Sequence, residues 1–145
     1  NLKGLEGFCC GAPGGDIIFG EGMLSGNGKL SLILPFDLPG TRDRTISCCG
    51  EPWAIRFDRL VERSSVREMS HSLAESDQEQ CVAANRFMLG KARLRAELLG
   101  VPLKVMLLWD GKDAVNPPPG GTGDFARLCD SQGLPPTIIP IPPQP

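Results

Sequence analysis

The chain has 145 residues, of which 41% are hydrophobic, and its formal net charge is −2. This length allows one domain with a single core, and the lack of a basic cluster argues against a nucleic-acid partner. No apolar run approaches the roughly 20 residues that cross a bilayer, and no charged start leads into a hydrophobic signal segment. We therefore expect a cytoplasmic protein with no membrane partner.

The first half of the chain alternates predicted strands and helices. We expect strands at 7–10, 30–34 and 66–69, helices at 16–25 and 53–63, and a polar loop at 37–45. The run Leu30–Leu34 is nearly all apolar, which is typical of a parallel strand buried on both faces. The helical spacing of four apolar side chains predicts that they face the sheet: Trp53, Phe57, Leu60 and Val61.

The second half continues this alternation. A capping box at Ser76–Glu79 opens the longest predicted helix, which Gly100 ends after Leu99. One face of this helix carries Cys81, Ala84, Met88 and Ala92. A strand at 103–109, a helix at 122–132 and a strand at 137–141 follow. His71 falls in a loop without a paired acid or a second ligand, so we regard it as incidental.

Strands alternating with helices predict a parallel sheet with right-handed crossovers. The expected fold class is therefore α/β, a three-layer Rossmann-like sheet with helices on both faces. We expect an N-terminal remnant at 1–6, a single domain at 7–141 and a proline-rich tail at 142–145. Asn1 in place of methionine indicates a processed chain or a fragment.

Six cysteines occur, including the adjacent pairs Cys9-Cys10 and Cys48-Cys49. Zinc sites usually take thiolates separated by about two to four residues, and adjacent cysteines in a strand point to opposite faces. Disulfide frameworks belong to small secreted domains with sparse cores. We therefore predict no metal site, and expect the cysteines to be small, buried, reduced side chains.

Two glycine-rich turns carry the strongest functional signal. Gly11–Asp16 and Pro119–Asp124 each lie where a predicted strand leads into a helix. Glycine lets backbone amides approach a ligand closely, and a helix start supplies free N–H groups at the positive end of its dipole. In parallel sheets ligands bind beyond the carboxyl ends of the strands, so we expect the two turns to form one composite pocket for phosphate or another anion.

The motifs together resemble the SLOG group of Rossmann-like domains. The resemblance is carried by Cys10–Phe19 followed by Leu32–Phe36, and by Leu108–Lys112 followed by Gly120–Thr122. It is closest to versions found with nucleotide cyclases and tetratricopeptide-repeat signalling proteins. The resemblance implies recognition of a nucleotide or nucleotide-derived signal by a sensor attached to an effector domain.

The chain departs from this group in two respects. Such domains generally begin with a further strand and helix, so we expect an N-terminal strand–helix unit to be missing, which would expose a sheet edge. The phosphoribohydrolase branch carries a Pro-Gly-Gly-x-Gly-Thr-x-x-Glu signature. Here Pro119–Gly123 keeps the glycines, whereas Asp124 replaces the threonine and Arg127 the glutamate. A phosphate cradle is compatible with this pattern, but the catalytic carboxylate is absent from that place.

Our first hypothesis is a non-catalytic nucleotide-binding module that requires no cofactor, functioning with an effector domain or as a homo-oligomer. Backbone amides and the Thr122 hydroxyl are expected to hold phosphates, and Asp110 to accept hydrogen bonds from a ribose. The expected ligand-binding residues are Gly14, Gly15, Asp16, Asp110, Gly120, Gly121, Thr122 and Gly123.

Two alternatives stay open. The first is a hydrolase that cleaves an N-glycosidic bond in a nucleotide or NAD-like substrate, with Glu21 as the candidate catalytic carboxylate. An exposed helical carboxylate without a catalytic role accounts for Glu21 more simply. The second is an interaction or scaffold domain that binds no small molecule.

Overall fold

The computed structural model describes residues 1–69, 75–112 and 114–141. The chain divides into two compact units, unit 1 at Asn1–Leu73 and unit 2 at Ala74–Pro145. Each unit contains parallel strands together with helices, which confirms the α/β class. No helix in these ranges has the length and apolar composition needed to cross a membrane.

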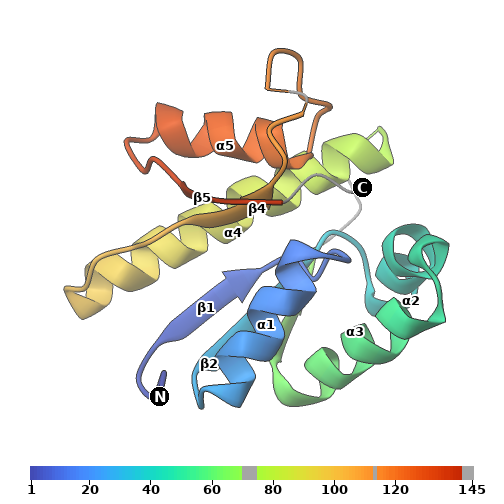
Figure 1. Cartoon of the computed structure of the whole chain (residues 1–145), viewed down its shortest axis with the longest axis horizontal. Helices are drawn as coiled ribbons and strands as arrows, with labels where there is room; N and C mark the ends of the chain where they lie inside the picture. Colours follow the sequence, from blue (N-terminus) through green and yellow to red (C-terminus); the bar gives the residue numbers. More distant parts are fainter. Residues whose placement is uncertain (70–74, 113, 142–145) are drawn as a thin grey trace. The chain divides into compact units, whose positions relative to one another are not determined.

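Unit 1 is built on a three-stranded parallel sheet (Figure 1). Its principal elements are β1 (Glu6–Cys9), α1 (Gly15–Ser25), β2 (Lys29–Leu34), α3 (Glu51–Arg63) and β3 (Ser65–Glu68). The strand order is β1-β2-β3, with Cys9 paired to Leu32 and Leu34 paired to Glu68. All five predicted elements in this unit are confirmed, with ends shifted by one or two residues.

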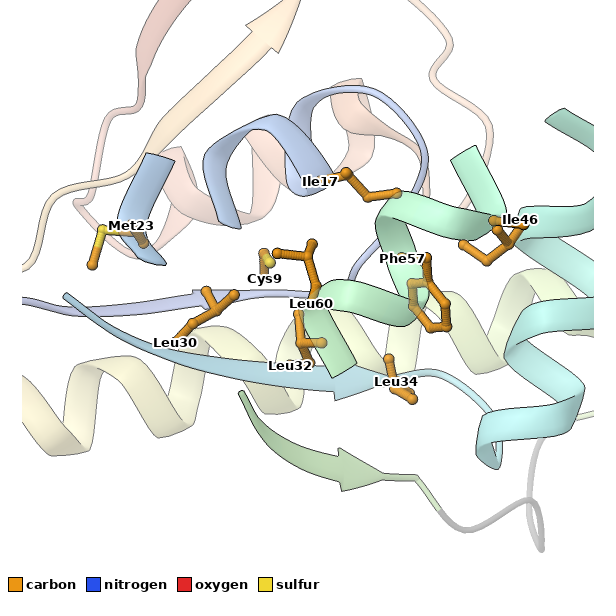
Figure 2. Packing of buried hydrophobic residues seen from close by; sticks show 10 residues of the cluster. Cys9, Ile17, Met23, Leu30, Leu32, Leu34, Ile46, Phe57 and Leu60 are labelled. Atoms are coloured by element: carbon orange, nitrogen blue, oxygen red, sulfur yellow. The ribbon is translucent and has the colours of Figure 1, made fainter. Parts of the chain in front are cut away.

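The core of unit 1 lies between the sheet and the helices α1 and α3 (Figure 2). Alternation along β2 places Leu30, Leu32 and Leu34 on one face of the sheet, where they join one buried cluster with side chains of both helices. The helical members include Ile17 and Met23 of α1 and Ala54, Phe57 and Leu60 of α3. Trp53 and Val61 pack against the cluster, as the spacing predicts.

The prediction of a loop at 37–45 is wrong. This region forms α2 (Leu38–Thr41), the π-helix η1 (Arg42–Ile46) and the 3₁₀-helix η2 (Ser47–Cys49). The Asp37 carboxylate caps the first turn by accepting a hydrogen bond from the Gly40 amide at 2.9 Å, and Ile46 is fully buried at the other end. A helix cap and one buried anchor therefore outweigh the polar, proline-containing composition.

Unit 2 contains α4 (Asp77–Leu99), β4 (Met106–Trp109), α5 (Thr122–Ser131) and β5 (Thr137–Pro140). Strands β4 and β5 pair in parallel, and α5 connects them (Figure 1). The β4 strand begins at Met106 rather than at the predicted Leu103, and its register with the four residues of β5 starts at that residue. The other predicted elements of this unit are confirmed within one residue.

The capping box of α4 forms in a modified way. Ser76 Oγ accepts a hydrogen bond from the Glu79 amide at 3.2 Å, as expected. The Glu79 carboxylate accepts in return from the amide of Glu75, one residue before the cap, at 2.8 Å. Gly100 ends the helix in the left-handed conformation, and the Val101 amide donates back to the Ala96 carbonyl.

The cysteines do not share one environment. Cys9 and Cys129 are buried, as expected, whereas Cys48 and Cys49 are exposed. The expectation of burial is wrong for this second pair because it lies in the 3₁₀-helix η2 and not in a strand.

Candidate functional site

The second glycine turn is tightly packed within unit 2. Gly120 has a φ of +78°, and a Cβ atom there would lie 2.7 Å from the Cβ of Cys81. The Gly120 carbonyl accepts a hydrogen bond from the Asn85 side chain at 3.1 Å, and its amide donates to the Asp124 carboxylate at 3.0 Å. Only glycine fits this position, because both the conformation and the approach to α4 exclude a side chain.

The turn opens helix α5 with free backbone donors. Gly121 is the N-cap and offers no side-chain cap. The first helical hydrogen bond runs from the Phe125 amide to the Gly121 carbonyl. The amides of Thr122, Gly123 and Asp124 therefore have no acceptor among the residues that the structure describes.

Two of these residues, Thr122 and Gly123, line a pocket of about 250 Å³. Its lining combines the start of α5, one residue of the loop before it and residues at the carboxyl ends of β4 and β5. These residues are Leu108, Trp109, Asp110, Pro118, Thr122, Gly123 and Ile141. Three predicted site residues, Asp110, Thr122 and Gly123, thus share one pocket. Gly120 and Gly121 precede the helix and shape the turn without lining the pocket.

Asp110 is held as an ionised acceptor at this pocket. Its carboxylate accepts hydrogen bonds from the Lys112 amide at 3.0 Å and pairs with the Lys112 ammonium at 3.1 Å. The backbone hydrogen bond, followed by that of the ammonium, lowers the pKa of Asp110. Trp109 is fixed by the same short turn, since its indole N–H donates to the Lys112 carbonyl at 3.0 Å.

The first glycine turn, in unit 1, is closed by its own carboxylate. One oxygen of Asp16 accepts hydrogen bonds from the amides of Cys10 at 3.0 Å and Ala12 at 3.2 Å. Loss of hydration raises the pKa of Asp16, and the hydrogen bonds from the turn, including one from Gly11, oppose that rise. The anion at the centre of this turn is therefore a side chain of the protein.

Free amides nevertheless remain at the start of α1. Gly14 is its N-cap, with a φ of +97° and no side-chain cap, and the first helical bond runs from Ile18 to Gly14. Within the described ranges, the amides of Gly15, Asp16 and Ile17 have no acceptor. The two turns belong to different units, and their expected convergence on one anion stays a prediction.

Glu21 is one partner of an ion pair between two helices. Both of its carboxylate oxygens accept from the Arg56 guanidinium, at 2.8 and 2.6 Å. Arg56 in turn lies over the Trp53 ring, 4.4 Å from its centroid. The hydrogen bond from Arg56 is the largest of the effects that lower the pKa of Glu21. A carboxylate held in this way contributes to α1–α3 packing and gains no support as a catalytic acid.

Arg127 stands where the phosphoribohydrolase signature has glutamate. Its guanidinium donates to the carbonyl of Ala114 at 2.9 Å and also to that of Val115. It therefore ties the loop before the second turn to helix α5. The described part of the chain holds no group of three potential metal ligands, and His71 lies outside it.

The sequence did not predict four of the pocket residues: Leu108, Trp109, Pro118 and Ile141. Trp109 ends β4 and Ile141 directly follows β5, so the rule that ligands bind beyond carboxyl strand ends provides a signal for both. Comparison with known proteins finds no matching family model, no significantly similar curated protein and no significantly similar solved structure.

Proposed function

We propose that the pocket in unit 2 binds the phosphate–ribose part of a nucleotide or a nucleotide-derived signal. The observation that carries this proposal is the meeting of unpaired α5 amides, the Thr122 hydroxyl and the ionised Asp110 around one cavity. Helix N-terminal amides favour anionic oxygen, and a carboxylate accepts hydrogen bonds from sugar hydroxyls.

The size of the pocket limits what it takes in. Ligand sites usually enclose about 300–1,000 Å³, whereas this pocket encloses about 250 Å³. A phosphate with its sugar fits such a volume better than a whole nucleotide does. The base is then left at the opening, where the Trp109 ring supplies a surface for stacking.

The charge of the pocket favours weak, reversible binding. No lysine or arginine is among the described residues that line it. Phosphate recognition therefore depends on backbone dipoles and one hydroxyl, which is suited to a ligand whose concentration is being sensed. This agrees with the SLOG resemblance, from which we propose a cytoplasmic, non-catalytic sensor with an attached effector domain and a three-layer Rossmann-like sheet.

Calorimetry on the full chain tests this proposal, with adenine and guanine nucleotides, cyclic nucleotides and ADP-ribose as ligands. We expect saturable binding of at least one of them. A ligand at about 100 times its dissociation constant should also raise the free energy of unfolding by about 2.7 kcal/mol. Absence of both effects with every ligand, on folded protein, contradicts the proposal and favours a scaffold domain.

Matched variants locate the site. Thr122→Val removes a hydroxyl from the pocket, whereas Thr137→Val makes the same change at the opposite end of β5. Asp110→Asn and Asp130→Asn form a second such pair, because Asp130 is exposed on α5 outside the pocket lining. Binding should weaken in the first member of each pair only. Equal weakening in both members would place the ligand elsewhere.

A further inference from the structure

Cys48 and Cys49 form an exposed pair of thiols at the end of an irregular helical segment in unit 1. Their sulfur atoms lie 3.7 Å apart, and both residues are exposed. They occupy the 3₁₀-helix η2, which directly follows the π-helix η1. Short π-helical and 3₁₀ segments recur at functional sites.

The local backbone sets the direction of both side chains. The Cys48 thiol lies 3.6 Å from the Thr45 carbonyl, to which it donates. The Ser47 hydroxyl donates to the Arg42 carbonyl at 2.9 Å and so helps to hold the same segment. With the Cys48 proton directed to the backbone, its sulfur is left as the acceptor for the Cys49 thiol.

The other adjacent pair has no such geometry. Cys9 ends strand β1 and is buried in the core, while Cys10 follows the strand and its amide donates to Asp16. The Cys9 thiol donates to the Asp16 carbonyl at 3.6 Å, within unit 1. Burial also raises the pKa of Cys9 and holds it as a neutral thiol.

Neither a disulfide bond between them nor a structural zinc site suits Cys48 and Cys49. Adjacent Cα atoms are about 3.8 Å apart, whereas disulfides usually join Cα atoms about 4.4–6.8 Å apart, so a bond between neighbours is strained. Structural zinc needs four ligands, and among the described residues no third ligand joins this pair. An electrophilic atom that binds two thiols and needs no further ligand from the protein is compatible with both of these constraints.

We propose that Cys48 and Cys49 are a dithiol site for monosubstituted trivalent arsenicals and chemically equivalent soft centres. In the binding step, R–As(OH)₂ reacts with both thiols to give R–As(S–Cys48)(S–Cys49) and two molecules of water. Two As–O and two S–H bonds break, and two As–S and two O–H bonds form. Arsenic remains trivalent, so the step needs no oxidant or reductant.

Intact-mass measurement with phenylarsine oxide tests the proposal on the full chain in the presence of excess glutathione. We expect one arsenical per chain, retained against glutathione and removed by a small dithiol. Cys48→Ser and Cys49→Ser should each weaken retention by about 100-fold or more, because the chelate is reduced to a single bond. The matched variant Cys10→Ser should retain the arsenical as the unaltered chain does.

Two results would overturn the proposal. One is full retention in Cys48→Ser or Cys49→Ser, and the other is displacement by glutathione from the unaltered chain. Circular dichroism of each variant distinguishes loss of the site from loss of the fold. Cys48 and Cys49 are exposed and Cys10 is only half-buried, so we expect all three variants to fold.

Discussion

The two glycine turns have similar sequences and differ in what their amides contact. In each, glycines precede a helix whose first turn contains an aspartate that accepts from the turn itself. Asp16 is the second residue of α1 and accepts from two amides within 3.2 Å. Asp124 is the third residue of α5 and accepts from the single amide of Gly120. The position of one carboxylate decides how far a turn satisfies its own donors.

The two glycine turns also differ in whether a pocket adjoins their free amides. The α5 amides lie beside a pocket to which β4 and the residue after β5 contribute Trp109, Asp110 and Ile141. At the first turn, the carboxylate of Asp16 already occupies the place that an anion would take. We therefore expect a glycine turn before a helix to bind an anion only where its amides stay free and a cavity adjoins them.

The largest effect should come from filling the second turn. Gly120→Ala places a Cβ 2.7 Å from Cys81 and forces an alanine to a φ of +78°. We expect a loss of roughly 3 kcal/mol or more in the free energy of unfolding, from clash and strain together. Gly14→Ala should cost less, since its φ is +97° but no atom lies within 4 Å of the new Cβ.

Urea unfolding of both variants measures this difference. Gly90→Ala is the control, because Gly90 lies within α4 with no atom within 4 Å of an added Cβ. Alanine there should stabilise the helix by about 0.5–1 kcal/mol. Equal losses for Gly120→Ala and Gly14→Ala would mean that backbone strain alone matters and that the close approach to α4 does not.

Removing Asp16 or Asp124 should show how much the stability of each turn depends on its carboxylate. Asp16→Ala leaves the amides of Cys10 and Ala12 without their acceptor, which should cost roughly 2–3 kcal/mol. Asp124→Ala frees one amide and should cost about 1 kcal/mol. Thermal and chemical unfolding both measure which of the two variants loses more stability. A larger loss for Asp124→Ala would contradict the view that the first turn depends more on its carboxylate.

The pH dependence of stability should differ between the two sites. The pKa of Asp16 is raised in the folded state, so folding favours its protonated form. Its contribution therefore falls as pH rises from the unfolded value, about 3.9, through the raised folded value. The pKa of Asp110 is lowered, so its contribution is present above that unfolded value and is lost on acidification.

Asp16→Asn separates these contributions. The asparagine oxygen can still accept from the turn, but the side chain no longer titrates. Subtracting the variant's free energy of unfolding from that of the unaltered chain, between about pH 4 and pH 7, should give a difference that falls with pH. A flat or rising difference contradicts the assignment of a raised pKa to Asp16.

Local patterns predicted most of the elements but not their long-range arrangement. The apolar run Leu30–Leu34 and the helical spacing of Phe57 and Leu60 are properties of short segments, and both agree with the observed core. The helical run after Asp37 was missed because one cap and the burial of Ile46 outweigh its loop-like composition. Burial of that kind depends on distant residues and leaves little local trace.

The residues that line the pocket were also predicted only in part. Asp110, Thr122 and Gly123 line one pocket, as expected, because strand ends and helix starts are visible in the sequence, and their part in binding stays a prediction. Pro118 was missed because its place in the lining depends on how the chain between β4 and α5 folds back. The closure of the first turn by Asp16 depends on a single side-chain rotamer. An aspartate after glycines is equally compatible with capping the helix and with closing the turn, so the sequence alone does not distinguish these two roles.

The smallest effect on stability is expected for Glu21 on α1, and the same variant tests whether this residue is catalytic. Glu21→Gln removes a partly exposed ion pair with Arg56 and should cost less than about 1 kcal/mol, because solvent screens such pairs. Glu62→Gln, an exposed change on α3, is the matched control and should cost close to nothing. Chromatography of nucleotide and NAD mixtures incubated with each protein supplies the second readout. Base release that only Glu21→Gln abolished would assign Glu21 to catalysis and favour the hydrolase, whereas a small stability loss alone assigns it to the contact between α1 and α3.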